Sequence, residues 1–382
     1  MEFSQLMPAI AGMTWQNVVM IVVGLVLIFL AIKKGYEPTL LLPIGFGAIL
    51  VNIPFSAVLT QVDPEGNTVV GALNVFFNAG IITEVFPLLI FVAIGAMIDF
   101  SPLFQRPMLL IFGAAAQFGI FMTMILATLC GFNLKEAASI GIIGAADGPT
   151  SIIVATQFAK NLLGPISVAA YSYMALVPII QPPIIRLLTS QKERQIKMNF
   201  DANKKVSRTT RIIFPITVTI LAGIIAPSSL ALIGFLMFGN LIRECGVLNG
   251  LSKTAQNELA NIVTILLGIT IASTMKGADF VQPATLMILA LGIIAFVFDT
   301  AGGVMIAKLI NKFAKSDKKI NPMIGACGIS AFPMSARVIH SMGLKEDKHN
   351  YLLMPAISAN VGGQIGSVIV GGLILMLVPL FA

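Results

Sequence analysis

One short stretch combines features that a membrane-buried helix seldom carries. Residues 141–156, GIIGAADGPTSIIVAT, place Asp147 in the middle of a long apolar run. Gly144, Gly148 and Pro149 surround this carboxylate, and neither glycine nor proline continues a regular helix comfortably. A carboxylate is costly in hydrocarbon, and irregular backbone is tolerated there only inside protein or beside a wet cavity. The stretch therefore predicts a discontinuous helix with an ion site; the alternative is a Gly/Pro kink whose charge is locally satisfied.

Composition places the whole chain in a membrane. Only 11% of its 382 residues are charged and 57% are hydrophobic, with a mean hydropathy of +0.94, whereas a soluble domain carries about 25% charge. Several apolar runs reach the roughly 20 residues that a spanning helix needs. The first run, 18–32, lacks a basic leader and a cleavage site, so it predicts a retained helix. These features predict an all-α polytopic membrane protein whose basic loops report topology rather than nucleic-acid binding.

The apolar pattern occurs twice along the chain. Full crossings are expected at 17–32, 38–53, 85–98, 108–130 and 166–185, with a broken segment at 137–159. Four stretches of this first half have similar counterparts later in the chain, in the same order. The pairs are 38–52 with 227–240, 90–100 with 269–280, 144–154 with 328–338, and residues near 164 with residues near 355. With about five crossings per half, an odd number, the second half begins on the opposite side of the membrane from the first. The halves are then inverted repeats, and their broken segments meet near the midplane as in secondary transporters.

Charge distribution then sets the predicted orientation. If both broken segments are re-entrant, most basic residues fall on one side, including the 186–211 stretch and the 308–319 cluster. Lys135, Lys160 and Lys276 lie on the other side, near membrane boundaries. The positive-inside rule makes the basic side cytoplasmic and both termini external. Counting the broken segments as full crossings would export the basic loop, which the same rule disfavours.

These predictions divide the chain into three parts. Residues 1–188 form a first inverted repeat with a re-entrant segment at 137–159. Residues 189–211 form a basic cytoplasmic linker. Residues 212–382 form a second inverted repeat with a re-entrant segment at 320–342.

The second broken segment also carries polar groups. Its sequence, INPMIGACGISAFPMSARVIHSM, offers oxygen donors at Asn321 and Ser330 and a single strong charge at Arg337. A re-entrant arginine can pair with a carboxylate or hold an anion, and it can instead extend to the cytoplasmic surface. Carboxylate, amide and hydroxyl oxygens suit a hard cation, so Na⁺ or H⁺ is the expected ligand.

Other candidates come with structural alternatives. Tyr171 and Tyr173 open an apolar span, where an interfacial aromatic belt is the competing explanation. Asn360 and Gln364 offer oxygens one helical turn apart, among glycines that close helix packing would also explain. Asp299 is the deepest of the lesser acidic candidates, which are Asp99, Asp279 and Asp299.

Three stretches resemble a known family. GIIGAADGPTSI, YSYMALVPIIQPPIIRLLT and ANVGGQIGSV are similar to the β subunits of sodium-pumping, biotin-dependent decarboxylases that act on oxaloacetate, methylmalonyl-CoA, glutaconyl-CoA or malonate. The resemblance covers nearly the whole chain. It implies decarboxylation of carboxybiotin, coupled to Na⁺ export and proton uptake. The short length of the chain favours an acyl-CoA complex over an oxaloacetate complex.

The resemblance also assigns roles to residues. It implies catalytic roles for Asp147, Tyr173 and Arg337, with Tyr173 and Arg337 also binding carboxybiotin. The implied Na⁺ ligands are Asp147, Asn321, Ser330 and Asn360, and the implied structural residues of the site are Gly148, Pro149 and Gly325.

Partners are required if the resemblance holds. The chain has no biotin-attachment motif and no carboxyltransferase domain. The expected partners are therefore a biotin carrier subunit, a carboxyltransferase α subunit, a small membrane-anchored subunit and membrane lipid, within an oligomer in a bacterial or archaeal cell (inner) membrane. The alternative function is a stand-alone secondary carrier that moves a small anion with Na⁺ or H⁺.

Overall fold

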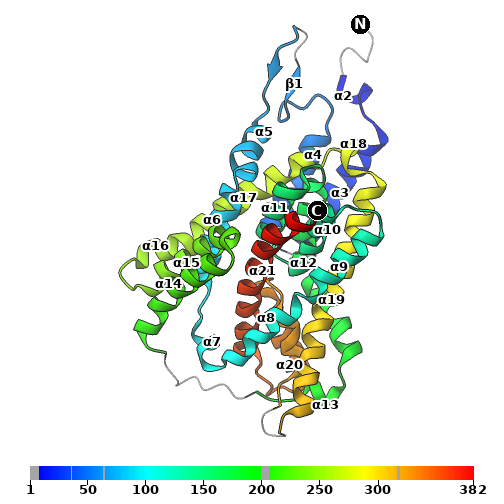
Figure 1. Ribbon diagram of the computed structural model, residues 1–382. Helices are drawn as coiled ribbons and strands as arrows, with labels where there is room; N and C mark the ends of the chain where they lie inside the picture. The colour runs from blue at the N-terminus through cyan, green and yellow to red at the C-terminus, as the bar shows by residue number, and fades with distance from the viewer. Residues whose placement is uncertain (1–7, 36, 63–64, 199–205, 316–318) are drawn as a thin grey trace.

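The chain folds almost entirely into helices. The computed structural model describes residues 8–35, 37–62, 65–198, 206–315 and 319–382 (Figure 1). Parts of the predicted basic linker (199–205) and of the lysine cluster (316–318) lie outside these residues. Within the described residues, seven helices are long and apolar enough to cross a membrane: Trp15–Lys34, Pro107–Leu129, Lys160–Leu188, Arg208–Ile225, Asn249–Thr274, Pro283–Phe313 and Leu353–Phe381. The predicted all-α polytopic class is therefore confirmed.

Other predicted crossings are shorter than expected. Helices α4 (Pro38–Asn52) and α15 (Leu230–Glu244) each have 15 residues, and α6 (Val85–Met97) has 13. Helix α6 follows α5 (Ala72–Phe76) and the π-helical turn η1 (Phe77–Ile82) at a bend of 60°, and together they make an eighth candidate span. Length and composition thus support fewer spans than the ten that were expected.

One connection contains strands, which the sequence analysis missed. Strands β1 (Gln61–Val62) and β2 (Thr68–Val69) pair antiparallel in the loop after α4. The hairpin has a physical basis, since β-branched residues favour extended backbone and Gly66 adopts a left-handed turn conformation with φ +88. It extends beyond the helices on the side of the N-terminus (Figure 1).

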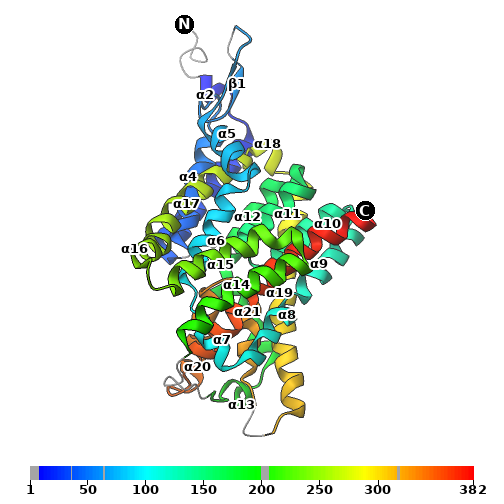
Figure 2. The same cartoon turned by 60° about the vertical axis from the view of Figure 1, so that its left-hand side comes forward.

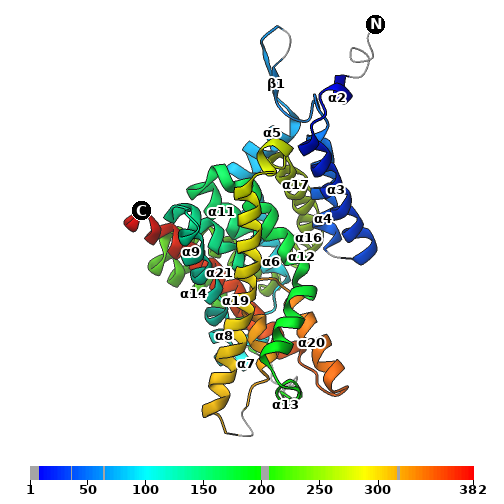
Figure 3. The same ribbon diagram turned by 90° about the vertical axis from the view of Figure 1, so that its right-hand side faces the viewer.

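Outer helices present apolar side chains. Helix α3 (Trp15–Lys34) exposes Val22, Leu25 and Phe29, and α14 (Arg208–Ile225) exposes a similar row. Exposed aliphatic and aromatic rows of this length suit contact with lipid. Figure 3 shows α3 and α4 along one edge of the molecule, beside α17 (Ala260–Ile271).

Two asparagines hold corresponding helix junctions. Asn52, at the end of α4, donates its Nδ2 to the Met275 carbonyl (2.7 Å) and accepts the Gly277 N–H at its Oδ1 (2.7 Å). Asn240, near the end of α15, donates to the carbonyls of Gly95 (3.3 Å) and Ile98 (2.9 Å). Both amides are buried. Helix α4 thereby packs against α17, and α15 packs against α6, as Figure 2 shows.

Long helices surround two interrupted segments at the centre. The first segment comprises α10 (Leu134–Gly141), η3 (Ile142–Ala145) and α11 (Gly148–Phe158). The second comprises the 3₁₀ helix η9 (Pro322–Gly328) and α20 (Met334–Glu346). Three helices flank them: α12 (Leu163–Leu188), α19 (Pro283–Phe313) and α21 (Leu353–Phe381).

Backbones approach very closely in this core. A Cβ atom added to Gly325 in η9 would lie 2.0 Å from the Gly303 carbonyl oxygen in α19, and one added to Gly303 would lie 2.0 Å from the Gly325 oxygen. Only glycine at both positions permits this contact. The approach fixes η9 against α19 and so positions the end of the second interruption.

Candidate functional site

Asp147 occupies the gap between two short helical pieces. The 3₁₀ turn η3 ends at Ala145, Ala146 adopts a left-handed conformation (φ +52), and Asp147 is extended at the N-cap of α11. Pro149 follows at the start of the helix, where its missing N–H costs little. Oδ1 of Asp147 accepts the Thr150 N–H (3.2 Å). The carboxylate is only 3% exposed, and it faces the positive end of α11.

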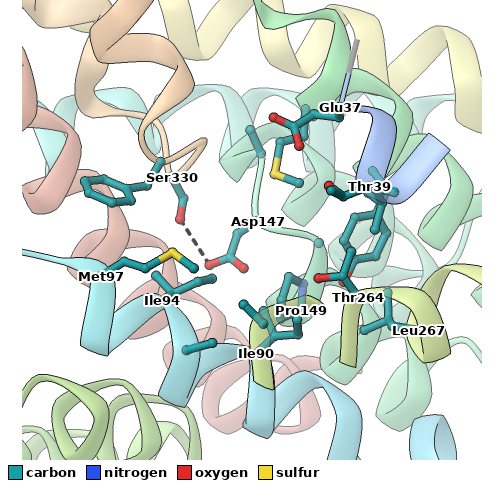
Figure 4. Close-up of a pocket in the computed structure, with 18 of the residues that line it drawn as sticks. Glu37, Thr39, Ile90, Ile94, Met97, Asp147, Pro149, Thr264, Leu267 and Ser330 are labelled. Carbon is teal, nitrogen blue, oxygen red and sulfur yellow. Dashed lines mark hydrogen bonds between the residues drawn. The ribbon is translucent and has the colours of Figure 1, made fainter. Parts of the chain in front are cut away.

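The second interruption meets the first at this carboxylate. Ser330 lies in the unwound stretch between η9 and α20, and its N–H donates to the Ala145 carbonyl (2.9 Å). Its hydroxyl donates to Oδ2 of Asp147 (3.3 Å), as the dashed line in Figure 4 marks. Residues 183 positions apart in the chain thus share one site.

Helix α21 completes the surroundings of Asp147. The Ser367 hydroxyl donates to Oδ2 of Asp147 (2.8 Å). Asn360, about two turns earlier, donates its Nδ2 to the carbonyls of Cys327 (3.3 Å) and Ile329 (2.7 Å) at the end of η9. Its Oδ1 and the Oε1 of Gln364 are buried without a hydrogen-bond partner among the described residues. Gln364 lines the cavity beside Asp147 and Asn360 does not, so the Oε1 of Gln364 is the free amide oxygen that accompanies the carboxylate.

A cavity of about 200 Å³ opens beside Asp147. It lies where the central helices face α4, α6 and α17, and Figure 4 shows the side chains around it. Among the described residues, its lining includes no lysine, arginine or histidine. The lining includes Glu37, Thr39, Ile90, Met97, Asp147, Tyr171, Thr264, Ser330 and Gln364. Water and a small cation fit this space, and the charged groups of its lining are both carboxylates.

The two tyrosines of α12 point to different places. Tyr171 lines the cavity; its hydroxyl is buried and has no partner among the described residues. Its ring packs on Gly148, where an added Cβ would lie 2.3 Å from ring carbons. Tyr173 lies outside the cavity lining and donates its hydroxyl to the Leu289 carbonyl of α19. Of the two, only Tyr171 lies beside Asp147.

Asn321 lies at the other end of η9. Its Nδ2 donates to the carbonyls of Arg194 and Ile196 (2.8 Å each), and its Oδ1 accepts the Met323 N–H (3.1 Å). Asn321 is not among the residues that line the cavity. The structure therefore brings Ser330 and Asp147 together, but places Asn321 where it ties η9 to the stretch after α12.

Arg337 stands apart from the carboxylate. It lies on α20 and is exposed, and its side chain makes no hydrogen bond or ion pair with another described residue. It does not line the cavity, but its positive charge acts on Glu37, which does. An exposed guanidinium without a protein partner remains able to bind an anion.

Two residues of the site escaped the sequence analysis. Ser367 follows Gln364 by three residues on the same face of α21, and this helical spacing was the signal that could have identified it. Glu37 stands between two apolar runs, directly before Pro38. A carboxylate at such a junction was a detectable signal, but the adjacent lysines make an ordinary polar turn the simpler interpretation.

Comparisons with known proteins find relatives over nearly the whole chain. The family model of the Na⁺-transporting oxaloacetate decarboxylase beta subunit matches residues 16–378. The chain is 47% identical to the methylmalonyl-CoA decarboxylase subunit beta of Propionigenium modestum, over 96% of both chains. It is 48% identical to the glutaconyl-CoA decarboxylase subunit beta of Acidaminococcus fermentans, over 96% of this chain and 94% of the relative. It is 44% identical to the oxaloacetate decarboxylase beta chain of Haemophilus ducreyi, over 96% of both.

The fold and the site define a polytopic helical membrane protein with a carboxylate at the junction of two interrupted helices. The matches over nearly the full length of chain and relatives then identify the family. The chain belongs to the family of Na⁺-transporting decarboxylase beta subunits.

Proposed function

We propose that this chain is the membrane subunit that decarboxylates carboxybiotin and couples this reaction to Na⁺ export and proton uptake. The observation that carries the proposal is the position of Asp147 between hydroxyls from the second interrupted segment and from α21. A carboxylate surrounded by uncharged oxygens suits Na⁺. Family membership argues against a stand-alone carrier, because the relatives are named as subunits of decarboxylases.

The Na⁺ ligands that the geometry supports best lie around the Asp147 carboxylate. They are Asp147, Ser330 and Ser367, with Oε1 of Gln364 from the cavity lining and, outside that lining, Oδ1 of Asn360 as further candidate oxygens. Asn321 acts here through η9, because its amide is already bonded to three backbone groups. Gly148, Pro149 and Gly325 fix the two interruptions, which allows both to reach one ion.

Carboxybiotin, as substrate, meets the chain at Arg337. The exposed guanidinium lacks a protein partner among the described residues, which fits a role in holding a carboxylate. Carboxybiotin releases CO₂ when it is protonated or desolvated, and the reaction consumes a proton. Tyr173 assists the proton uptake of decarboxylation without lining the cavity, since its hydroxyl is bonded to α19. Tyr171 lies nearer to Asp147.

The scaffold of this proposal is a pair of inverted repeats, 1–188 and 212–382, joined by a basic cytoplasmic linker. The matched amide contacts of Asn52 and Asn240 support it, because each joins one half to the other at a corresponding junction. The interrupted segments would enter from opposite faces as re-entrant elements. Both termini would then lie outside a bacterial or archaeal cell membrane.

The complex must supply what the chain lacks. We include a biotin carrier subunit, a carboxyltransferase α subunit and a small membrane-anchored subunit, within an oligomer. The test is Na⁺ transport in proteoliposomes containing the complex, with and without the biotin carrier. Transport that depends on the carrier and on a decarboxylation substrate supports the pump. Transport of a solute by this chain alone would establish the stand-alone carrier instead.

A further inference from the structure

Glu37 shares the cavity with Asp147. It is the N-cap of α4 and lines the space that opens onto Asp147 (Figure 4). Glu37 is half-buried, and its side chain makes no hydrogen bond or ion pair with another described residue. A half-buried carboxylate in the lining of an acidic cavity, with no side-chain partner in the described part of the chain, has no evident structural task.

The backbone at this position is also unusual. Glu37 adopts a left-handed conformation with φ +34, which residues with a β-carbon seldom occupy. Its side chain does not cap α4, although it stands at the N-cap. An asparagine or glycine would satisfy the backbone more easily. Function is therefore a better explanation of glutamate here than helix capping.

Arg337 lies on α20, seven residues after the cavity-lining Ser330, and its positive charge acts on Glu37. Burial raises the pKa of Glu37, and the charge of Arg337 lowers it. The other titratable groups of the cavity are Asp147 and Tyr171. Arg337 and Glu37 form no ion pair, so the charge of Arg337 acts on Glu37 at longer range and the exposed guanidinium stays open to another anion.

We propose that Glu37 is the ion-capturing carboxylate at the mouth of the Asp147 cavity, and that occupation of Arg337 by an anion switches it on. This inference rests on the proposed function of Arg337. When a substrate carboxylate neutralises Arg337, Glu37 faces the cavity as an uncompensated negative charge and draws Na⁺ toward Asp147. The coupling is reciprocal, so bound Na⁺ strengthens binding of the anion to the same degree.

The experiment uses the assembled complex and free carboxybiotin as the probe. Decarboxylation is measured over a grid of Na⁺ and carboxybiotin concentrations for wild type, Glu37→Gln and Glu258→Gln. Glu258 is the matched control, since it is exposed and its side chain makes no hydrogen bond or ion pair with another described residue. In wild type, the Na⁺ concentration for half-maximal rate should fall as carboxybiotin rises.

Glu37→Gln should raise that Na⁺ concentration about tenfold and abolish its dependence on carboxybiotin, because the steering charge is lost. Glu258→Gln should behave as wild type. Glu37→Asp keeps the charge and should keep the coupling, which separates lost charge from faulty assembly. Wild-type coupling in Glu37→Gln would overturn the inference. A wild-type complex without any Na⁺ dependence would overturn the proposed function itself.

Discussion

The two interrupted segments use similar backbone breaks for different chemistry. The first carries its charge at the break, where Asp147 caps α11. The second has no charge at its break and offers the Ser330 hydroxyl there, and its arginine lies further along, on α20. Under the proposed function, one segment supplies the ion-binding carboxylate, and the other supplies a neutral ligand and an anion site. The proposed inverted repeats would thus divide cation and anion binding between the two halves of the chain.

Support for the two breaks also differs. The first is held by the Asp147 cap of α11, by the close fit of Gly148 on Tyr171 of α12, and by the bond from Ser367 of α21 to Asp147. The second is held from outside, by Asn360 at its inner end and by Asn321 at its outer end. A movement of α21 would therefore act on both breaks, through Ser367 and Asn360, whereas a movement of the stretch after α12 would act on the second, through Asn321.

The largest expected effect follows removal of the charge that distinguishes the first segment. Asp147→Asn should abolish Na⁺-stimulated decarboxylation and leave assembly intact. An amide keeps the shape but loses a Coulomb attraction worth several kcal/mol in a site shielded from water. Initial rates against Na⁺ concentration measure the effect, with the exposed Asp279→Asn as control. Normal pumping by Asp147→Asn would remove Asp147 from the list of ligands.

A second prediction concerns the close contact that fixes the second segment. Gly325→Ala should destabilise the protein by about 1–3 kcal/mol or prevent assembly, because overpacking forces backbone shifts. The added Cβ would lie 2.0 Å from the Gly303 oxygen. Thermal unfolding in detergent measures the loss. Gly250→Ala, on an exposed helix with no atom within 4 Å of the added Cβ, is the control and should not destabilise.

Arg337 provides the third prediction. Arg337→Lys keeps the charge but loses the planar fork that binds a carboxylate through two hydrogen bonds. We expect the carboxybiotin concentration for half-maximal decarboxylation to rise about tenfold, with a smaller change in the Na⁺ dependence. Free carboxybiotin is the substrate in this assay. A shifted Na⁺ dependence with an unchanged carboxybiotin dependence would mean that the anion and cation roles are reversed.

The sequence revealed much of this arrangement because its signals were local. A carboxylate among Gly144, Gly148 and Pro149 has few explanations in hydrocarbon, and that set indicated both the helix break and the candidate ion site. Contacts across the fold were harder to predict. Asn321 stands in a polar segment, yet its amide is bonded to carbonyls that precede it by 127 and 125 residues. Nothing in the local pattern indicates that pairing.

Ser367 illustrates the same limit from the other side. It lies among glycines in a helix whose small residues already have a packing explanation. Its contact with Asp147 joins residues 220 positions apart, so only the packing of α21 against α11 reveals it. Spacing from Gln364 could have suggested the face of the helix, but not what that face contacts.

The smallest expected effect compares the two hydroxyls that reach one carboxylate oxygen. Ser367 Oγ lies 2.8 Å from Oδ2 of Asp147, and Ser330 Oγ lies 3.3 Å from it. A hydrogen bond to a charged group contributes about 1.5–3 kcal/mol, and the shorter bond should contribute more of that range. Ser367→Ala should therefore raise the Na⁺ concentration for half-maximal rate about tenfold, and Ser330→Ala about threefold. Ser358→Ala is the control, because that hydroxyl donates to the Met354 carbonyl within α21. A larger effect at Ser330 would show that the second segment, rather than α21, provides the closer ligand when Na⁺ is bound. That result would support the view that the two interrupted segments form two halves of one site.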